Sequence, residues 1–384
     1  MFEKPEILEL GLYVHIPFCV RKCFYCDFNS GPAGVEMRHE HLHALEQEIR
    51  KSSWRGQGGR TVFFGGGTPS ELSIDELTAL VDALCETFAI TPGAEWTIEC
   101  NPGTVNREAL EAIRALGFNR ISLGVQSFHD HHLKALGRIH DSGEALQAYR
   151  AARQAGFENI NLDLIFALPH QDLLEWEADL SQALALAPEH LSLYNLTIEP
   201  NTEFGRRHSR GQLQEAGEDL SADMYELALD LTAEAGYGQY EISNFARPGY
   251  ECAHNLIYWR NEPYLGFGVS AASYISGLRW SNTGNWHEYA AHAASESIPH
   301  ATEERLHGQT ALAEEIMLRL RTREGLSMNA LSQKYNCEMP RLFADTLRFL
   351  TQEELLNNDG DRLTLSRRGQ LLANEVCLQF LSHS

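Results

Sequence analysis

The chain has 384 residues, 43% of them apolar, which is enough for a barrel-sized core and a small additional domain. Its 31 basic and 53 acidic residues give a net charge of −22, which disfavours nucleic acids and anionic membranes as partners. Because no apolar run has membrane-spanning length and the N-terminal MFEKPEILEL lacks the regions of a signal peptide, we expect a cytoplasmic protein.

Short apolar runs alternate with longer amphipathic stretches over the first 240 residues. The predicted strands cover 12–16, 61–64, 96–99, 120–124, 161–165 and 190–196. The predicted helices between them cover 37–52, 74–88, 108–116, 143–155 and 173–187, and Ser73 and Asp141 are suitable N-caps. Repeated strand–helix units indicate a parallel sheet, so we expect an α/β fold with a partial (β/α)6 TIM-like barrel over residues 1–240.

The rest of the chain divides into two further segments. Residues 241–305 are rich in aromatic residues and lack a clear period, so we expect a connecting region there. Residues 306–384 become helical again and end near LLNNDGDRLTLS, which predicts a β-hairpin and a small winged-helix-like domain. With 9 basic and 10 acidic residues, this domain is expected to act as a lid or scaffold rather than to bind DNA.

Three of the eight cysteines lie within HIPFCVRKCFYCDF, where Cys19, Cys23 and Cys26 are spaced C-x3-C-x2-C. A disulfide framework is not expected in a cytosolic chain of this size, and we expect the dispersed Cys85, Cys100, Cys337 and Cys377 to be buried as small apolar side chains. Three close thiolates indicate a metal centre. A four-iron cluster with one iron free of protein is favoured over a zinc site completed by His15.

The other polar candidates follow the ends of the predicted strands. The cysteine loop follows the first strand, FFGGGTPS contains the end of the second, and Glu99, Gln126 and Asp163 lie at or near the ends of the next three. The carboxyl ends of barrel strands meet at one mouth, so these segments are expected to build one site. FFGGGTPS lacks the lysine of a phosphate-binding P-loop, but its glycines can bring bare backbone close to a ligand.

A C-x3-C-x2-C loop after the first strand of a barrel, followed by a glycine-rich turn after the second, resembles the radical S-adenosylmethionine superfamily. The resemblance implies that the amino and carboxylate groups of S-adenosylmethionine occupy the open iron. It also implies that an electron donor reduces the cluster. The reduced cluster then splits this cosubstrate into methionine and a 5′-deoxyadenosyl radical. A fourth thiolate would block that iron.

Over almost its whole length the chain is similar to the coproporphyrinogen-dehydrogenase-like family of that superfamily. The matching segments include YVHIPFCVRKCFYCDF, FFGGGTPS, TIECNPGT, RISLGVQSF, LGRIH and NLDLIFALP. The resemblance implies that S-adenosylmethionine is held by Tyr13, Gly66, Gly67, Thr68, Glu99, Gln126, Arg138 and Asp163, with backbone from Tyr25.

Two features resemble the HemW-type branch, which looks like a haem chaperone. Phe28 stands where the dehydrogenase has a further cysteine, and the barrel begins by residue 12 without a long preceding extension. HNLIYW matches the H-N-x-x-Y-W signature of the branch. By that match His254 is the expected haem ligand beside Tyr258 and Trp259, with Cys252 as a weaker alternative.

The branch implies a protein that binds haem and passes it to haem-accepting proteins such as respiratory enzymes. The alternative is oxidative decarboxylation of coproporphyrinogen III to protoporphyrinogen IX by the deoxyadenosyl radical. A purely structural iron–sulfur scaffold is a third, less favoured interpretation, because the set expected to hold S-adenosylmethionine is complete.

Overall fold

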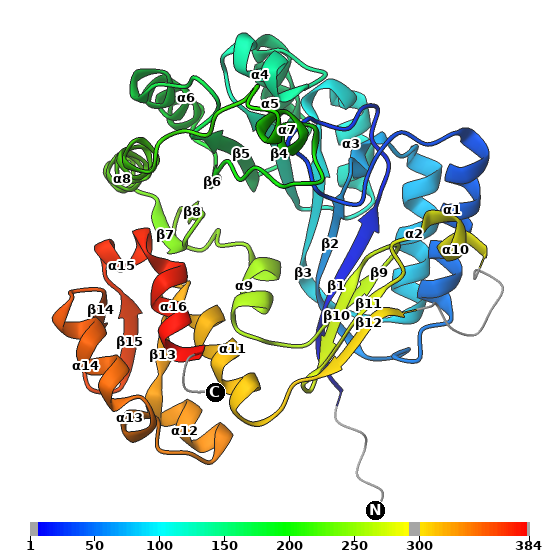
Figure 1. Ribbon diagram of the computed structural model, residues 1–384. Helices are drawn as coiled ribbons and strands as arrows, with labels where there is room; N and C mark the ends of the chain where they lie inside the picture. The colour runs from blue at the N-terminus through cyan, green and yellow to red at the C-terminus, as the bar shows by residue number, and fades with distance from the viewer. Residues whose placement is uncertain (1–6, 292–299, 382–384) are drawn as a thin grey trace, which may run out of the picture.

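The computed structural model describes residues 7–291 and 300–381 (Figure 1). Part of the N-terminal segment used above for the cytoplasmic prediction, and parts of the two downstream segments, lie outside these ranges. Six strands carry the barrel: β1 (Glu9–Ile16), β2 (Gly58–Gly66), β3 (Ala89–Cys100), β4 (Arg120–Gln126), β5 (Ile160–Phe166) and β6 (His190–Asn195). The helices of this part are α1 (Val35–Arg50), α2 (Ile74–Thr87), α3 (Arg107–Ala115), α4 (Asp130–Leu136), α5 (Ser142–Gln154), α6 (Leu173–Leu186), α7 (Glu203–Ser209) and α8 (Glu218–Glu234).

The expected partial barrel is confirmed, because β1 to β6 pair in parallel and in chain order. Among the described residues the sheet continues at both edges, to a total of twelve strands. Beyond β6 lie β8 (Asn244–Ala246) and β7 (Gly238–Glu241). Beyond β1 lie β9 (Tyr264–Phe267), β10 (Ala272–Ile275), β11 (Leu278–Asn282) and β12 (His300–Arg305).

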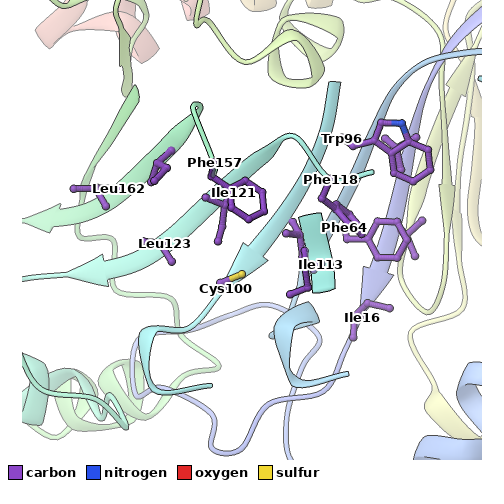
Figure 2. Packing of buried hydrophobic residues seen from close by; sticks show 14 of the residues in the cluster. Ile16, Phe64, Trp96, Cys100, Ile113, Phe118, Ile121, Leu123, Phe157 and Leu162 are labelled. Atoms are coloured by element: carbon purple, nitrogen blue, oxygen red, sulfur yellow. The ribbon is translucent and has the colours of Figure 1, made fainter. Parts of the chain in front are cut away.

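The sequence divides each barrel strand into an apolar and a polar set of alternating residues. In β5, Leu162 and Leu164 join the large core cluster that also contains residues of the surrounding helices, whereas Asn161 and Asp163 join polar side chains of neighbouring strands. Figure 2 shows the apolar set, in which Phe118 packs edge-on against both Phe64 and Trp96. Side chains on successive strand residues point to opposite faces, so one strand can build both the core and the site.

The C-terminal segment forms a small unit with its own core cluster. It contains α11 (Gly308–Leu320), α12 (Met328–Tyr335), α13 (Met339–Leu342), α14 (Ala344–Gln352), α15 (Arg367–Leu371) and α16 (Ala373–Leu381). Its sheet has the order β13 (Leu326–Ser327), β15 (Arg362–Leu365), β14 (Leu356–Asn358), so the predicted hairpin is present and the arrangement is winged-helix-like.

The C-terminal unit contacts the barrel at β7 and at the turn that follows it. The Arg323 amide donates to the Tyr240 carbonyl at 2.9 Å, and the Ile242 amide donates to the Arg321 carbonyl at 3.1 Å. Residue 240, the boundary drawn from the sequence, therefore lies within a short β7–β8 hairpin that belongs to the barrel sheet and also touches the C-terminal unit.

The dispersed cysteines are not all buried as expected. Cys100 and Cys377 are buried, which confirms the prediction for them, and Cys337 is half-buried. For Cys85 the prediction is wrong, because the helix period of α2 turns this residue outward while Leu84 beside it packs in the core.

The sequence contains no apolar run of membrane-spanning length, and the structure can be compared with this through its helices. None of the helices within residues 7–291 and 300–381 combines the length and the apolar composition needed to cross a lipid bilayer.

Candidate functional site

The cysteine loop between β1 and α1 is held in place by backbone hydrogen bonds. The Cys19 amide donates to the Gly31 carbonyl at 3.0 Å, and the Gly31 amide donates to the Pro17 carbonyl at 2.9 Å, which closes the neck of the loop. At its far side the Phe24 amide donates to the Leu136 carbonyl, the last residue of α4, at 2.9 Å. A loop tied at both sides presents its side chains in a defined direction.

Cys19, Cys23 and Cys26 are free thiols, half-buried, and all three line one cavity. Donors approach their sulfurs: the Thr68 hydroxyl lies 3.6 Å from Cys19 Sγ, and Arg138 Nη1 lies 3.4 Å from Cys23 Sγ. Such donors stabilise negative charge on thiolate sulfur. Burial nevertheless raises the pKa of the Cys19 and Cys26 thiols, so a bound metal would be needed to hold all three cysteines as thiolates.

The zinc alternative needs His15 as a fourth ligand beside the three cysteines. Both ring nitrogens of His15 are engaged, since Nδ1 pairs with the Tyr13 hydroxyl at 3.0 Å and Nε2 with the Asn29 carbonyl at 3.1 Å. The arrangement fits a larger cluster better than the zinc alternative.

A cavity of about 390 Å³ opens beside the cysteines at the carboxyl ends of the barrel strands. Its walls bring together eight of the nine residues expected from the sequence to hold S-adenosylmethionine: Tyr25, Gly66, Gly67, Thr68, Glu99, Gln126, Arg138 and Asp163. They come from the cysteine loop, β2, β3, β4, β5 and the segment after α4. Tyr13 does not line it; its hydroxyl pairs with His15.

The glycine turn at the end of β2 places bare backbone against the cavity. Gly66 has φ +110°, in the region that side chains rarely adopt, and a Cβ there would lie 2.5 Å from Cε1 of His15. At Gly67 a Cβ would lie 2.5 Å from the Phe18 carbonyl oxygen. Glycine is therefore required at both positions, by close packing against β1 at Gly66 and against the cysteine loop at Gly67. Carbonyl groups of such a turn can accept hydrogen bonds from an ammonium group.

Two carboxyl groups lie on the barrel wall of the cavity. Glu99 Oε2 accepts from the Gly66 amide at 3.0 Å, and burial, reinforced by the nearby Asp163 carboxylate, raises the pKa of Glu99 to about 7. Asp163 accepts from the Ser122 hydroxyl at 2.9 Å and from the Asn161 amide at 2.8 Å, and burial raises its pKa as well. Carboxylates placed in this way can accept hydrogen bonds from ribose hydroxyls or an ammonium group.

Hydrogen bonds fix the position of the Arg138 guanidinium, and an unusual backbone conformation sets the position of Gln126. Arg138 Nη2 donates to the Gly124 carbonyl at 2.6 Å, while Nη1 faces Cys23, so the guanidinium lies between β4 and the cysteine loop. Gln126 has φ +69°, an unusual value for a non-glycine residue, at a register shift between Gly124 and Gln126. Such strained positions are concentrated at functional sites, and here the shift accompanies a side chain that lines the cavity.

The HNLIYW segment forms a short helix, α9 (Ala253–Trp259), away from this cavity. His254 is 1% exposed, and both ring nitrogens are engaged: Nδ1 with Thr61 Oγ1 at 2.8 Å and Nε2 with the Tyr258 hydroxyl at 2.9 Å. Its ring stacks on Phe63 with centroids 5.1 Å apart. Burial, with Arg120 nearby, lowers the pKa of His254 to about 3, so the ring is neutral. In this conformation no ring nitrogen of His254 is free for iron.

The other aromatic and thiol candidates of this segment are also packed into the protein. Tyr258 lies edge-on to Tyr264 with centroids 4.6 Å apart, and Trp259 is half-buried at the end of α9. Cys252 is fully buried, and burial raises the pKa of its thiol to about 12. The side chains of this segment pack against the barrel. The expected haem role of these residues stays a prediction, and it would require the segment to leave this packed position.

Two family profiles match the chain. Residues 13–183 match the Radical SAM superfamily, and residues 306–372 match the HemN C-terminal domain. The protein named heme chaperone HemW of Lactococcus lactis is 37% identical over 381 residues, covering 99% of this chain and 98% of its own. The chain belongs to the HemW family of the radical SAM superfamily.

Further HemW proteins and one solved structure agree with this membership. HemW of Bacillus subtilis is 38% identical, with 96% of this chain and 98% of its own covered, and HemW of Escherichia coli is 45% identical over 69% of this chain and 70% of its own. The structure described as coproporphyrinogen III oxidase (HemN) from Escherichia coli, a radical SAM enzyme, has a TM-score of 0.86 and 26% identity, covering 97% of this chain and 90% of its own.

Several cavity residues of this HemW-family chain were not singled out from its sequence. Ser122, Tyr194 and Asn195 line the wall between β4 and β6, and Thr197 lies just beyond β6. For Ser122 and Tyr194 the signal is strand alternation, because Ile121 and Leu123 beside Ser122, and Leu193 beside Tyr194, pack in the core. Ser122 also lies within RISLGVQSF, whereas no motif or strand period indicates Asn195 or Thr197.

Proposed function

We propose that this protein is a haem chaperone that carries a 4Fe–4S cluster and S-adenosylmethionine, binds haem and delivers it to haem-accepting proteins. The observation that carries the proposal is the presence of three free cysteines beside a cavity with eight family-matched residues, in a chain related to named haem chaperones over nearly its full length. Cys19, Cys23 and Cys26 would hold the cluster, which supplies one-electron chemistry when bound.

The residues of the cavity have separable tasks toward the cosubstrate. The carbonyls of the Gly66–Gly67 turn would accept from its ammonium group, and Arg138 would pair with its carboxylate. Glu99 and Asp163 would accept from hydroxyl or ammonium groups, and Tyr25 would contribute backbone. Because these groups are hydrogen-bonded to strands and to the cysteine loop, they orient the bound molecule relative to the cluster.

Haem binding is the part of the proposal that needs a rearrangement. Ligation of iron by His254 would require its ring to release Thr61 or the Tyr258 hydroxyl and α9 to move from the barrel. Cys252 would need to lose a proton that burial holds firmly. A haem protein that transfers its cargo can use such a costly ligand, since a tight site would oppose release.

A second candidate function is the oxidative decarboxylation of coproporphyrinogen III. The overall similarity to the HemN structure favours it. Against it stands Phe28, which is 64% exposed at the edge of the cavity, where the dehydrogenase is expected to have a cysteine. The chaperone proposal is therefore preferred.

The proposal is tested by titrating haem into the anaerobically reconstituted protein and following the Soret band. We expect saturation at one haem per chain, in wild type and in a Cys85→Ala control, since Cys85 lies on α2, outside the cavity. His254→Ala is expected to shift or weaken the band. An absorbance change that rises without saturation, as for haem in buffer, would contradict haem binding; an unchanged spectrum in His254→Ala would remove the ligand assignment alone.

A further inference from the structure

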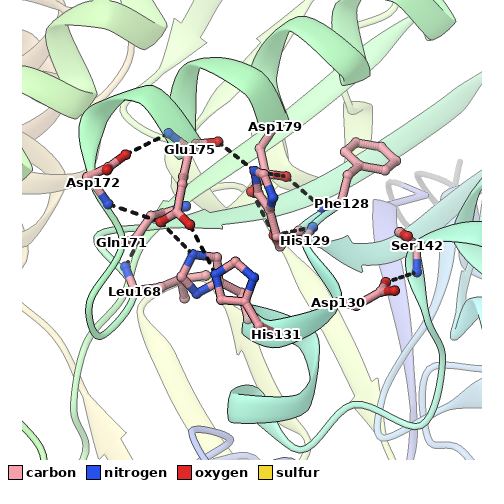
Figure 3. Close-up of polar contacts among 12 residues, drawn as sticks. Phe128, His129, Asp130, His131, Ser142, Leu168, Gln171, Asp172, Glu175 and Asp179 are labelled. Atoms are coloured by element: carbon pink, nitrogen blue, oxygen red, sulfur yellow. Dashed lines mark hydrogen bonds and ion pairs between the residues drawn. The ribbon is translucent and has the colours of Figure 1, made fainter.

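His131, His132 and Glu175 form a group between α4 and α6 (Figure 3), and none of the three lines the cysteine cavity. His131 and His132 lie on the first turn of α4, and Glu175 lies on the first turn of α6. His131 Nε2 is 3.1 Å from Glu175 Oε1, and His132 Nε2 is 3.1 Å from Glu175 Oε2. One ligand atom from each of the three side chains falls within 4.8 Å of the other two.

The carboxylate of this cluster is oriented by its own helix. Glu175 and Asp172 form a capping box, in which the Glu175 amide donates to Asp172 Oδ1 at 2.9 Å and the Asp172 amide donates to Glu175 Oε2 at 3.3 Å. These bonds fix the direction of the carboxylate before any ligand arrives.

The segment that leads into α4 is fixed to the same helix. The Asp179 side chain is fully buried and accepts from the Ser127 hydroxyl at 2.7 Å and from the Phe128 amide at 2.6 Å. The His129 ring, through Nε2, donates to the Glu175 carbonyl at 3.1 Å. The segment that leads to His131 and His132 is therefore anchored to α6, and Figure 3 shows the contacts of Phe128 with Asp179 and of His129 with Glu175.

The geometry matches the ligand spacing of a small transition-metal ion. Zinc binds imidazole nitrogen and carboxylate oxygen at about 2.0–2.2 Å, so ligand atoms around a tetrahedral ion lie about 3.4 Å apart. The two nitrogen–oxygen distances of 3.1 Å are close to this value. His132 is almost completely buried, whereas the side chain of His131 is 61% exposed. The group of three residues is therefore shielded from solvent at His132 and open at His131, where an ion and its water ligand can enter.

We propose that His131, His132 and Glu175 form a binding site for one divalent first-row transition-metal ion, with solvent completing the coordination. The ion would tie α4 to α6. At the other end of α4, the Leu136 carbonyl accepts from the Phe24 amide and the Gly137 carbonyl accepts from Arg21 at 2.7 Å. The site would thus stiffen the helix on which the cysteine loop rests. None of its three residues lies on α9 or lines the cysteine cavity, so this metal site does not rest on the proposed haem transfer.

The test uses untagged, cluster-loaded protein, so that Cys19, Cys23 and Cys26 do not compete for the added ion. Zn²⁺ is titrated against a chromophoric chelator, and Co²⁺ is added separately to record the absorption bands of a tetrahedral site. We expect each chain to bind one Zn²⁺ in addition to its iron–sulfur cluster. We also expect Co²⁺ absorption bands in the visible range and a higher melting temperature in the presence of Zn²⁺.

His131→Ala and Glu175→Gln should each weaken Zn²⁺ binding by about tenfold or more and abolish the Co²⁺ bands. Glutamine retains an acceptor for the Asp172 amide, so the capping box and the fold are preserved. His39→Ala, which removes an exposed histidine of α1, is the matched control and should bind as wild type does. Haem titration should be the same in all four proteins, which separates this test from that of the chaperone.

Equal Zn²⁺ affinity in wild type, His131→Ala and Glu175→Gln would overturn the proposal. Wild-type protein that gives no Co²⁺ bands would also overturn it, because His131, His132 and Glu175 would then be only two imidazoles hydrogen-bonded to a carboxylate.

Discussion

The buried position of Glu99 lowers the stability of the folded protein at neutral pH. Its carboxyl is buried beside Asp163, and a pKa raised to about 7 means that the folded state holds a proton that the unfolded chain releases near pH 4.5. The folded state is therefore penalised as pH rises from 4.5 to 7, and the penalty is complete above pH 7. A ligand that donates a hydrogen bond to the ionised carboxylate would recover part of this cost.

Glu99→Gln should separate these two effects. An amide cannot ionise, so the variant should gain free energy of unfolding relative to wild type at pH 8 and show little difference at pH 4.5. Its affinity for S-adenosylmethionine should fall, because a neutral amide is a weaker acceptor than a carboxylate. Denaturant unfolding at both pH values and a binding titration measure the two effects. A variant less stable than wild type at pH 8 would contradict the assigned cost.

The three cysteines of the loop should act as one set. Removing one thiolate exposes a second iron to solvent and oxygen, so the triple Cys19→Ala, Cys23→Ala, Cys26→Ala variant should lose essentially all cluster iron. The measurement is iron and sulfide analysis after anaerobic reconstitution, with Cys85→Ala as the control that keeps wild-type content. Four irons per chain in the triple variant would refute the cluster assignment.

At the scale of elements, the glycine turn after β2 is packed directly under the cysteine loop. Gly66→Val would place a branched side chain at φ +110°, 2.5 Å from the His15 ring. We expect S-adenosylmethionine affinity to fall by about tenfold or more, because backbone must approach the ligand there. The change in the electron paramagnetic resonance spectrum of the reduced cluster on adding the cosubstrate reports binding.

Gly93→Val is the matched control for this turn. Gly93 has φ +80°, but no neighbouring atom lies within 4 Å of the point where a Cβ would be added, so the variant carries similar backbone strain without touching the site. The control should respond to the cosubstrate as wild type does. If Gly66→Val responded equally, the close approach of ligand to this turn would be disproved.

Helix α9 is attached to the barrel by the buried His254. His254→Ala would leave Thr61 and the Tyr258 hydroxyl without this partner and open a cavity beside Phe63, so the free energy of unfolding should fall by about 2–4 kcal/mol. Tyr258→Phe, which removes a single hydroxyl, should cost about 1 kcal/mol. Denaturant titration without haem measures both. No loss of stability in His254→Ala would show that α9 is not anchored in this way.

The barrel was predictable from the sequence because its strands are long and its helices have clear periods and caps. Ser73 and Asp141 do cap α2 and α5. By contrast, α4 has seven residues and α9 has seven, and strands β7 to β12 have three to six residues each, too short for a period to be recognised. Their positions are set by contacts with distant parts of the chain.

The site was predictable where motifs concentrate residues. The cysteine spacing and glycine turn pointed to one mouth of the barrel, and the cavity collects both. The burial of His254 was not predictable, since nothing in HNLIYW indicates that Thr61, on a strand almost two hundred residues earlier, pairs with its ring.

At the scale of the whole molecule, the C-terminal unit and the barrel share α9. Arg319 Nη2 donates to the Arg260 carbonyl at 3.0 Å, just after α9, and Arg260 forms an ion pair with Glu324. A movement of α9 that frees His254 would therefore also change the contacts of Arg260 with the C-terminal unit. Under the proposed function, haem uptake at α9 would have a physical route to influence the C-terminal unit.

The central claim is that this protein transfers haem and does not decarboxylate porphyrinogens. The direct measurement incubates anaerobically reconstituted protein with S-adenosylmethionine and a reductant in two parallel reactions. One contains coproporphyrinogen III, and the other contains bound haem and apomyoglobin as acceptor. We predict that haem appears in myoglobin while no protoporphyrinogen IX is formed. Repeated turnover of coproporphyrinogen III, with haem retained or never bound, would contradict the account.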